Sequence, residues 1–597
     1  MKRNFYVLIS LITLASMILA ACGAKPTEAP VVPVVTEAPM ATEAPVVVCA
    51  PVGTEAIAFP DGGKSVTGAW SQEPNNITPF YTQMSYAVWI AQLTSVGLGE
   101  WDDKGNFVPE LAAEIPTAEN GGISADGLTV TWKLKPCLFW SDGDPLTSAD
   151  VKFTWESVMN PANASLSRVG YEKIASIETP DETTAVIKFS ELYPPWQTLF
   201  TQGPNNQGSI LPRHILEGQT GLESNPFIHW PIVSSGPFVI TEWVTGDYMT
   251  LLPNPNFHAG RAKLDRITIK FVPDPETALA ALQTGDVDWY PGFSEGDIGT
   301  VSALEPAVHL LVVPNPEWEH YFFNLGTTAG VDGRGKADAD GFCPFKDVRV
   351  RKAITLGINR QAFVDSLLSG KTIVPATQWP GTEWTNTSLK PDAYDPAAAD
   401  ALLDEADYKV GADGIRVGQC DGRDVKLSFN FETTIEQIHV DIALAVQSDL
   451  ARIGIEFKPI LTPVGTFFAS YSDGGDLPSG KFDMAGYTAG FYPDPMSGVL
   501  DSYSCDAIAN KDNPDGVNNY LLCNPQLDEM LAAVNASADP AVRKAALDAA
   551  QKYIFDNYYV IMMYQRANIH GYTDRFVPGA FGGFSGMNWN AEIWDVQ

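Results

Sequence analysis

The chain has 597 residues and a net charge of −34, from 38 Lys and Arg against 72 Asp and Glu. At roughly 150 residues per domain this length predicts two to four domains. The 45% content of hydrophobic residues excludes disorder as the overall state. The negative charge argues against a nucleic-acid partner, because a phosphate-binding surface needs a basic patch.

The N-terminus has the features of an export signal. Lys2 and Arg3 precede an apolar run from Val7 to Ile18, which is too short to span a bilayer comfortably. The run is followed by Leu19-Ala20-Ala21-Cys22, which resembles the lipobox of bacterial lipoproteins. We therefore predict a signal peptide over residues 1–21 and a lipid anchor on Cys22; a plain secretory signal with an incidental cysteine is the alternative.

Residues 22–55 have the composition of a tether. The segment is rich in Pro, Val, Thr, Glu and Ala and repeats Thr-Glu-Ala-Pro at residues 27–30, 36–39 and 42–45. Because proline disfavours both helix and sheet, we expect an extended spacer between the membrane and the folded body.

The body alternates helices and strands. In chain order we predict a strand over 128–134, a helix over 147–159, a helix from Pro275 to Thr284 capped by Asp274, a helix capped by Asp347, a long helix over 435–453 and a strand over 455–461. This alternation predicts α/β layers in more than one domain.

The cysteines do not form a metal-binding motif, because the sequence has no C-x-x-C. Cys505 and Cys523 bracket a loop rich in Asn, Asp and Gly, and we expect them to be bonded. Cys343 and Cys420 are a possible second pair. We expect Cys137 to be a buried free thiol, and Cys49 has no evident partner.

Catalytic and cofactor motifs are missing from the sequence. It contains no G-x-S-x-G, no H-E-x-x-H and no P-loop, and no two histidines are three or four residues apart. Asp338-Ala339-Asp340-Gly341 starts like a calcium loop but lacks the closing Glu. We expect no enzyme activity, no metal and no cofactor.

Several segments resemble one family. Residues 134–151, L-K-P-C-L-F-W-S-D-G-D-P-L-T-S-A-D-V, resemble the signature of the family 5 extracellular solute-binding proteins, the oligopeptide, dipeptide and nickel receptors of ABC importers. Five further segments resemble this family in the same order along the chain: residues 105–113, 235–243, 279–288, 345–360 and 395–403. The Cys505–Cys523 spacing is also like that of the dipeptide receptors.

The resemblance implies a two-lobed α/β binding protein of type II, with an extra N-terminal subdomain, around a ligand cleft. It places the N-terminal lobe at 56–318 with the subdomain at about 99–228, the C-terminal lobe at 319–563, and a tail at 564–597 that returns to the first lobe. The chain would cross between lobes near 319–323 and 562–565, and ligand binding would close the lobes.

The resemblance also supplies candidate ligand contacts. In peptide-binding relatives a segment like G-W-x-x-D-x-x-D/E-P lines the cleft, and its first Asp binds the peptide ammonium. Here the segment at 486–495 is one residue longer, and Gly490 or Phe491 falls at that Asp. The candidate ligand-binding residues are Tyr487, Thr488, Phe491, Asp494, Trp379, Trp384, Tyr321, Asn75 and Asn76. For several of these a turn or a core position is the alternative role.

We expect a monomeric, lipid-anchored receptor on the outer face of the cell membrane that delivers oligopeptides or a similar solute to an ABC permease and its ATPase. The alternatives are an oligosaccharide receptor of the same family and an exported hydrolase. Because the amine-binding Asp is missing or displaced, we expect a ligand that does not require a free α-amine; replacement of that Asp by Asp494 or Glu319 is the alternative.

Overall fold

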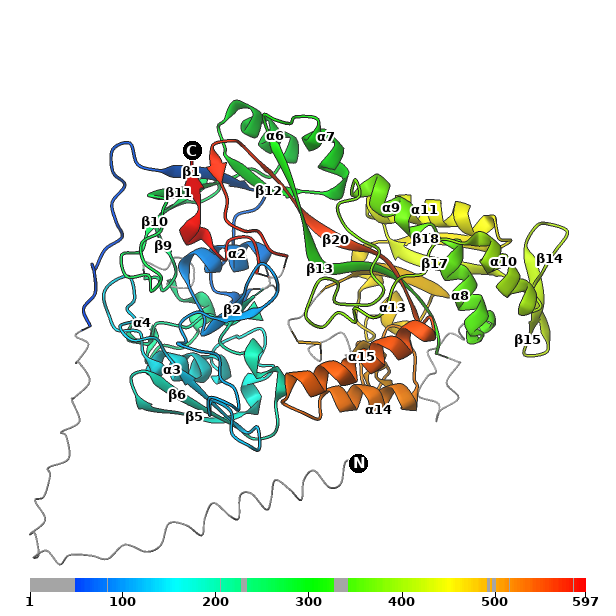
Figure 1. The fold of residues 1–597 in the computed structure, drawn as a ribbon, viewed down its shortest axis with the longest axis horizontal. Coiled ribbons are helices and arrows are strands. Elements are labelled where there is room, and N and C mark those ends of the chain that lie inside the picture. The colour runs from blue at the N-terminus through cyan, green and yellow to red at the C-terminus, as the bar shows by residue number, and fades with distance from the viewer. Residues whose placement is uncertain are drawn as a thin grey trace, which may run out of the picture. The chain divides into compact units, whose positions relative to one another are not determined.

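Two long strands pair along almost their whole length in the computed structural model. They are β13 (His309–Phe323) and β20 (Val560–Tyr572), which run antiparallel and side by side (Figure 1). The structure describes residues 49–597 except 83, 204–205, 227–232, 327–341, 491–493, 496–500, 515 and 584. The predicted signal peptide, the tether up to residue 48 and Asp338–Gly341 therefore lie outside the described residues.

β13 and β20 are central strands of a ten-stranded sheet. Its order is β18 (Glu456–Thr462), β17 (Ser428–Thr434), β19 (Met484–Ala489), β13, β20, β12 (Trp289–Phe293), β1 (Ser65–Trp70), β11 (Arg266–Phe271), β10 (Tyr248–Pro253), β9 (Phe238–Val244). The strands on one side of the central pair come from before residue 300, and those on the other side come from after residue 420. Two parts of the chain that are far apart in sequence thus share one sheet.

The smaller sheets belong to one part or the other. They are β4 (Thr129–Lys133) with β6 (Thr184–Phe189) and β5 (Ile174–Asp181); β3 (Phe107–Pro109) with β2 (Gly99–Trp101), β7 (Gln202–Gly203) and β8 (Asn206–Gln207); β14 (Lys409–Val410) with β15 (Arg416–Cys420) and β16 (Arg423–Lys426); and β21 (Phe576–Val577) with β22 (Asp595–Val596).

The helices pack on these sheets. In the N-terminal half they are α2 (Ser85–Thr94), α3 (Ser148–Met159), α4 (Arg213–Leu216), α6 (Pro275–Thr284) and α7 (Ile298–Ser302). In the C-terminal half they are α8 (Val348–Gly357), α9 (Arg360–Leu367), α10 (Pro396–Glu405), α11 (Gln437–Ala451), α12 (Val464–Phe467), α13 (Asp476–Ser479), α14 (Pro525–Val534) and α15 (Pro540–Asp556). Short 3₁₀ turns include η5 (Glu295–Asp297), η6 (Cys343–Lys346) and η9 (Ala591–Ile593).

The hydrophobic core has three main clusters. One is built from residues of the subdomain around Trp132 and Trp140, and a second surrounds Trp70 and Trp289. The largest extends along β13 and β20 through the C-terminal half. The C-terminal tail joins the second cluster, where the rings of Trp594 and Trp289 lie 5.3 Å apart. A tail too short to fold alone is thus buried on the N-terminal part of the chain.

Capping residues set the predicted helix starts. Thr147 Oγ1 accepts a hydrogen bond from the Ala149 backbone N–H, and Asp150 Oδ2 accepts one from the Thr147 backbone N–H, so that the two side chains form a capping box at α3. Asp274 and Asp347 cap α6 and α8 as predicted. The predicted strand at 128–134 is confirmed as β4, one residue shorter at each end.

The long helix α11 begins two residues later than predicted. The predicted range places Ile435 inside the helix, at three- and four-residue spacing from the other apolar residues, but it lies before the helix and its side chain is 56% exposed. Ile442, Val446 and Leu450 are buried as the spacing predicts. The start differs because β17 extends to Thr434, and residues 435 and 436 are needed to turn the chain out of the sheet.

Disulfides join Cys343 to Cys420 and Cys505 to Cys523. Cys137 was expected to be a buried free thiol, and that prediction is wrong. It is exposed and disulfide-bonded, and it lies beyond the end of β4 with a positive φ of 60°. The turn after the strand takes Cys137 out of the apolar layer. Cys49 is also disulfide-bonded.

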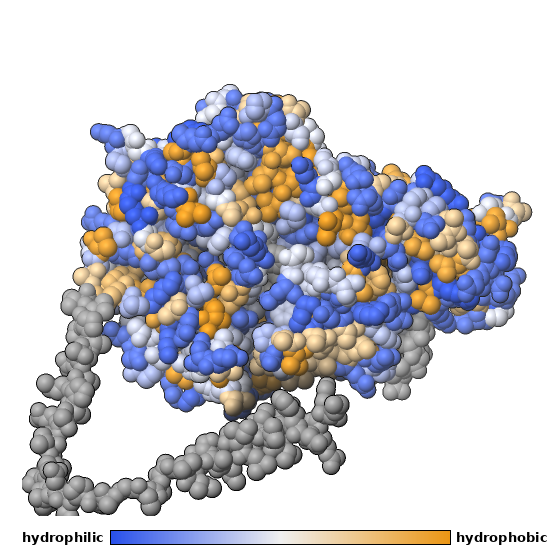
Figure 2. All heavy atoms as spheres, in the orientation of Figure 1, coloured by the Kyte–Doolittle hydropathy of each residue, from blue (hydrophilic) through white to orange (hydrophobic). Residues whose placement is uncertain are grey.

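The surface mixes polar and apolar residues. Figure 2 shows hydrophobic residues distributed among hydrophilic ones on one face, with a paler strip over the alanine-containing helices α14 and α15. None of the helices in the described ranges combines the length and apolar content needed to cross a bilayer.

Candidate functional site

Three neighbouring strands bring polar side chains into one row. Glu319 of β13 is paired directly with Thr488 of β19 on one side and with Tyr564 of β20 on the other. Directly opposed residues project from the same face of a sheet, so these three side chains are neighbours. Thr488 Oγ1 donates a hydrogen bond to Glu319 Oε2 at 2.8 Å. We call this place the strand crossing. Its members are these three residues and the charged residues around them, Glu295, Glu317, His439, Glu436 and Arg566.

A bulge in β13 adds one more carboxylate, that of Glu317, to the crossing. Between the pairs Pro314–Ala567 and Trp318–Gln565, three residues of β13 face the single residue Arg566 of β20. Bulges of this kind redirect side chains and are frequent beside functional sites. Here the bulge places Glu317 near Arg566.

Arg566 connects the crossing to the N-terminal part of the chain. Its Nε and Nη2 donate to the two carboxylate oxygens of Glu295 in η5 at 2.5 and 3.1 Å, and its Nη1 donates to Thr488 Oγ1 at 2.6 Å. Burial lowers the pKa of Arg566, but Glu295, Tyr564 and Glu319 together outweigh this and the net pKa is raised. Arg566 is therefore a fixed cation, and three of its N–H groups are already hydrogen-bonded.

His439 of α11 reaches the crossing from the C-terminal part. Its Nε2 lies 3.4 Å from Glu319 Oε2, and its Nδ1 lies 2.5 Å from Thr434 Oγ1. Burial alone would raise the pKa of Glu319, but His439 and Arg566 outweigh it and the pKa is lowered. Burial lowers the pKa of His439, and Glu319 reverses this so that the net pKa is raised. The two groups therefore favour an ion pair.

Two of the nine candidate ligand residues lie at or beside the crossing. Thr488 is a member of it, and Tyr487 is the preceding residue of β19, with its ring 4.7 Å from the His320 ring and 5.4 Å from the Phe468 ring. Both are partly exposed. Phe491 lies outside the described residues.

Asp494, a candidate ligand contact, is paired with an arginine of the chain itself. Both of its carboxylate oxygens accept hydrogen bonds from Arg543 of α15, at 2.6 and 2.8 Å, and both side chains are buried. The Arg543 guanidinium also lies 5.4 Å from the centre of the Trp384 ring. Asp494 and Trp384 are thus brought together, around a structural ion pair.

The other four candidates lie in the core or in a turn. Trp379 is fully buried with its ring 6.2 Å from that of Trp318, and Tyr321 is buried with its ring 4.3 Å from that of Phe431. Asn76 Oδ1 accepts from the Thr78 backbone N–H, and Asn75 Oδ1 accepts from Thr82 Oγ1. These contacts fit the alternative roles that the sequence left open for these residues.

Sequence reasoning missed most of the crossing. Glu295, Glu317, Arg566 and His439 come from four segments that no short motif links. Glu319 was considered only as a substitute anchor. The one available signal was the predicted chain crossing near residues 319–323 and 562–565, which identified the strands but not the bulge that assembles the side chains.

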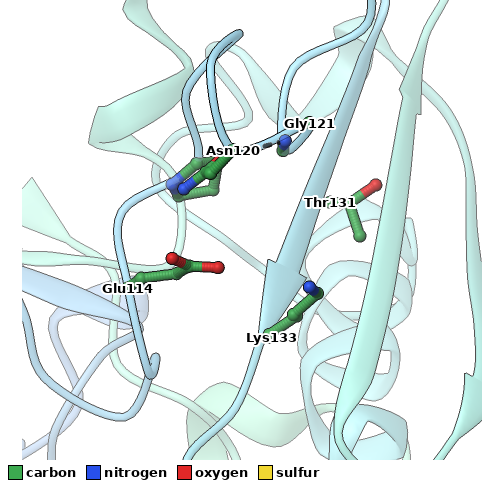
Figure 3. Close-up of a pocket in the computed structure, with 7 residues that line it drawn as sticks. Glu114, Asn120, Gly121, Thr131 and Lys133 are labelled. Atoms are coloured by element: carbon green, nitrogen blue, oxygen red, sulfur yellow. Dashed lines mark hydrogen bonds between the residues drawn. The ribbon is translucent and has the colours of Figure 1, made fainter.

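Two other places in the described residues were considered as binding sites: a cysteine cluster and a surface pocket. Cys343, Cys420 and Asp421 lie close enough to hold a metal among the described residues, but the two sulfurs are bonded to each other and offer no thiolate. A shallow pocket lies on the subdomain, where Glu114 and Lys133 flank an opening beside Asn120 (Figure 3). Its residues are mostly exposed, and it contains none of the candidate residues.

The fold identifies the class of protein. Two α/β parts that share a central sheet through two long strands define a two-lobed binding protein of type II, with its ligand cleft between the lobes. A sequence profile of the bacterial extracellular solute-binding proteins, family 5, matches residues 106–510. The chain belongs to this family.

Relatives and solved structures agree with this assignment. The oligopeptide-binding protein AppA of Bacillus subtilis is 25% identical over 527 residues, which cover 86% of this chain and 89% of AppA. The structure of that AppA in complex with a nonapeptide matches with a TM-score of 0.61 and 22% identity, over 90% of this chain and 99% of the other. NikZ from Campylobacter jejuni, in complex with Ni(L-His), matches with a TM-score of 0.65 and 23% identity, over 89% and 99%. One fold thus holds very different ligands, and the ligand has to be argued from the site.

Proposed function

We propose that this protein is the lipid-anchored receptor of an ABC importer and that it captures oligopeptides between its lobes for delivery to the permease. The family assignment carries the proposal, because family 5 consists of extracellular solute-binding proteins and AppA, among the relatives, is an oligopeptide-binding protein. The lipobox at Cys22 supports the anchor. The protein acts as a monomer and has no catalytic role.

The hinge geometry supports a closing mechanism. β13 and β20 connect the two parts of the chain, and Arg566 joins η5 on one side to β19 on the other. A ligand that contacts both sides stabilises the closed arrangement over the open one by its differential affinity. The permease then distinguishes loaded from empty receptor by shape.

The proposal is tested by identifying what the protein retains. Protein purified from its native membrane is denatured, and the released small molecules are analysed by mass spectrometry; we expect peptides. In parallel, the purified protein is incubated with labelled peptides and labelled glycans. Retained and chemically unchanged peptide supports the proposal. Retained glycan supports the oligosaccharide alternative, and turnover of either probe would show an enzyme.

A further inference from the structure

We propose that the strand crossing anchors a positively charged group of the ligand, an ammonium or a guanidinium. This inference rests on the proposed receptor function and specifies its ligand: the bound solute carries a cation, and the acids of the crossing receive it. The anchor lies in the hinge strands, away from the 486–495 loop in which the relatives' anchor was sought.

The crossing has a buried floor and an accessible rim. Glu319 and Tyr564 form the floor, with Glu319 1% exposed and Tyr564 fully buried. Glu317, Thr488 and Arg566 are partly exposed above them. Glu436, which precedes α11 and lies 3.9 Å from His439 Nδ1, is exposed at the edge. The rim residues are therefore the ones that a ligand group meets first.

Carboxylates outnumber cations at this place. The acids are Glu295, Glu317, Glu319 and Glu436, and the cations opposite them are Arg566 and His439. With all six groups ionised, two negative charges remain uncompensated. Burial raises the pKa of Glu317, and the positive charge of Arg566 only partly offsets this rise. A cation placed here would relieve this cost.

Three buried polar atoms of the crossing have no hydrogen-bond partner among the described residues. They are Glu319 Oε1, His439 Nε2 and the Tyr564 hydroxyl. A buried polar atom without a partner costs about 1–3 kcal/mol, so such atoms indicate where a ligand or water belongs. Both oxygens can accept from an N–H donor, and the carboxylate oxygen can do nothing else while ionised. The partner missing at Glu319 Oε1 is therefore a donor.

Arg566 is poorly placed to receive an anionic ligand group, because three of its five N–H donors are already used. Its Nε, Nη1 and Nη2 already donate to Glu295 and Thr488. A ligand carboxylate could use only the two remaining N–H groups, and it would lie close to the like charge of Glu295. The same arrangement admits a cation without breaking any of these bonds.

The expectation of an amine-independent ligand took account of only two substitute acids. Asp494 is held by Arg543, and Glu319 already receives Thr488 and His439 through one of its two oxygens. Gly490 is exposed, with nothing within 4 Å of the position of a Cβ. Glu317, which the bulge brings near Arg566 and Glu295, was not counted, and it changes the inference.

The test uses a pool of random pentapeptides without Lys, Arg or His, mixed in equal amounts with the same pool N-acetylated and isotope-labelled. Peptides retained by the full chain are weighed by mass spectrometry. We expect the free-amine form to be enriched at least about tenfold, which corresponds to about 1.4 kcal/mol. Acetylated peptides that carry one internal Lys should regain part of this enrichment, because the site receives a cation of either origin.

Variants locate the effect. In the double variant Glu317→Gln with Glu436→Gln, the enrichment should fall to within about threefold of unity while acetylated peptides are still retained, which also shows that the variant is folded. The matched control is Glu456→Gln, which should keep the full enrichment. Glu456 is an exposed acid at the start of β18 and is not a member of the strand crossing. Equal retention of both forms by the native protein, or unchanged enrichment in the double variant, overturns the anchor. Retention of neither form overturns the peptide-receptor proposal itself.

Discussion

At the scale of single residues, the buried ion pair between Asp494 and Arg543 shows how tertiary contacts can redefine a motif residue. The sequence places Asp494 before a proline in a segment that lines the cleft of relatives. In the fold, α15 brings Arg543 against it with two hydrogen bonds, and Arg543 Nε also donates to the Val534 carbonyl. The carboxylate therefore holds α15 to the 494 segment.

We predict that Asp494→Asn lowers the free energy of unfolding by about 3–5 kcal/mol, because Arg543 would be left buried without its counter-ion. The matched control is Asp556→Asn, whose exposed pair with Lys552 is worth less than about 0.5 kcal/mol. Urea denaturation of the two variants provides the measurement. Equal small losses in both would contradict the structural role of Asp494.

At the scale of elements, the central strand pair is fastened at its outer end by a histidine. His309 opens β13, and its two ring nitrogens lie 2.9 Å from Glu305 and 2.5 Å from Asp574, just beyond the end of β20. The Asp574 contact is the largest cause of a raised pKa, with Glu305 adding to it. The charged imidazolium therefore ties the start of one hinge strand to the end of the other.

The raised pKa has a defined pH dependence. A group with a raised folded-state pKa contributes stability below its unfolded pKa of about 6.5, and this is lost as the pH rises through the folded value. We expect His309→Gln to cost about 0.5–1 kcal/mol at pH 5.5 and close to nothing at pH 9. Denaturation of native and variant protein at both pH values measures it. A loss of the same size at both would show that packing, not charge, is responsible.

The disulfide between Cys505 and Cys523 closes a short loop. The two cysteines are 18 residues apart, and both are buried in a small cluster with Ile508 and Leu521. A closed loop of about this length contributes about 3 kcal/mol by the chain-entropy model. We expect Cys505→Ser with Cys523→Ser to lose that amount in urea denaturation. The bond itself is checked by intact mass after alkylation without reductant, where two labelled thiols at these positions would refute it.

At the scale of the whole molecule, the export and anchoring of the chain rest on its first residues. The basic start, the apolar run and Leu19-Ala20-Ala21-Cys22 together predict cleavage before Cys22 and acylation of its sulfur. We expect Cys22→Ala to release soluble protein or to leave an uncleaved precursor. Membrane fractionation followed by intact mass measures this, and a processed, membrane-bound variant would contradict the anchor.

Much of the fold could be predicted because the relevant signals are local. Asp274-Pro275 and Gly285 bound α6, and Thr147 with Asp150 starts α3, since capping depends on residues within one turn. The start of α11 could not be placed from the sequence. Ile435 fits the apolar period, but β17 extends to Thr434 and the chain needs residues 435 and 436 to turn out of the sheet. The aromatic candidates Trp379 and Tyr321 could not be told from core residues, since burial depends on partners distant in sequence.

The sequence by itself determined the family, the order of elements and the candidate export signal, because each is written in contiguous residues. Only the tertiary structure decided the site. Glu295, Glu317, Thr488 and Arg566 come from four segments, and they meet because β19, β13 and β20 pair in one register and because β13 bulges opposite Arg566. Strand register and bulges depend on pairing between distant segments, and a shift of one residue would turn these side chains to the other face.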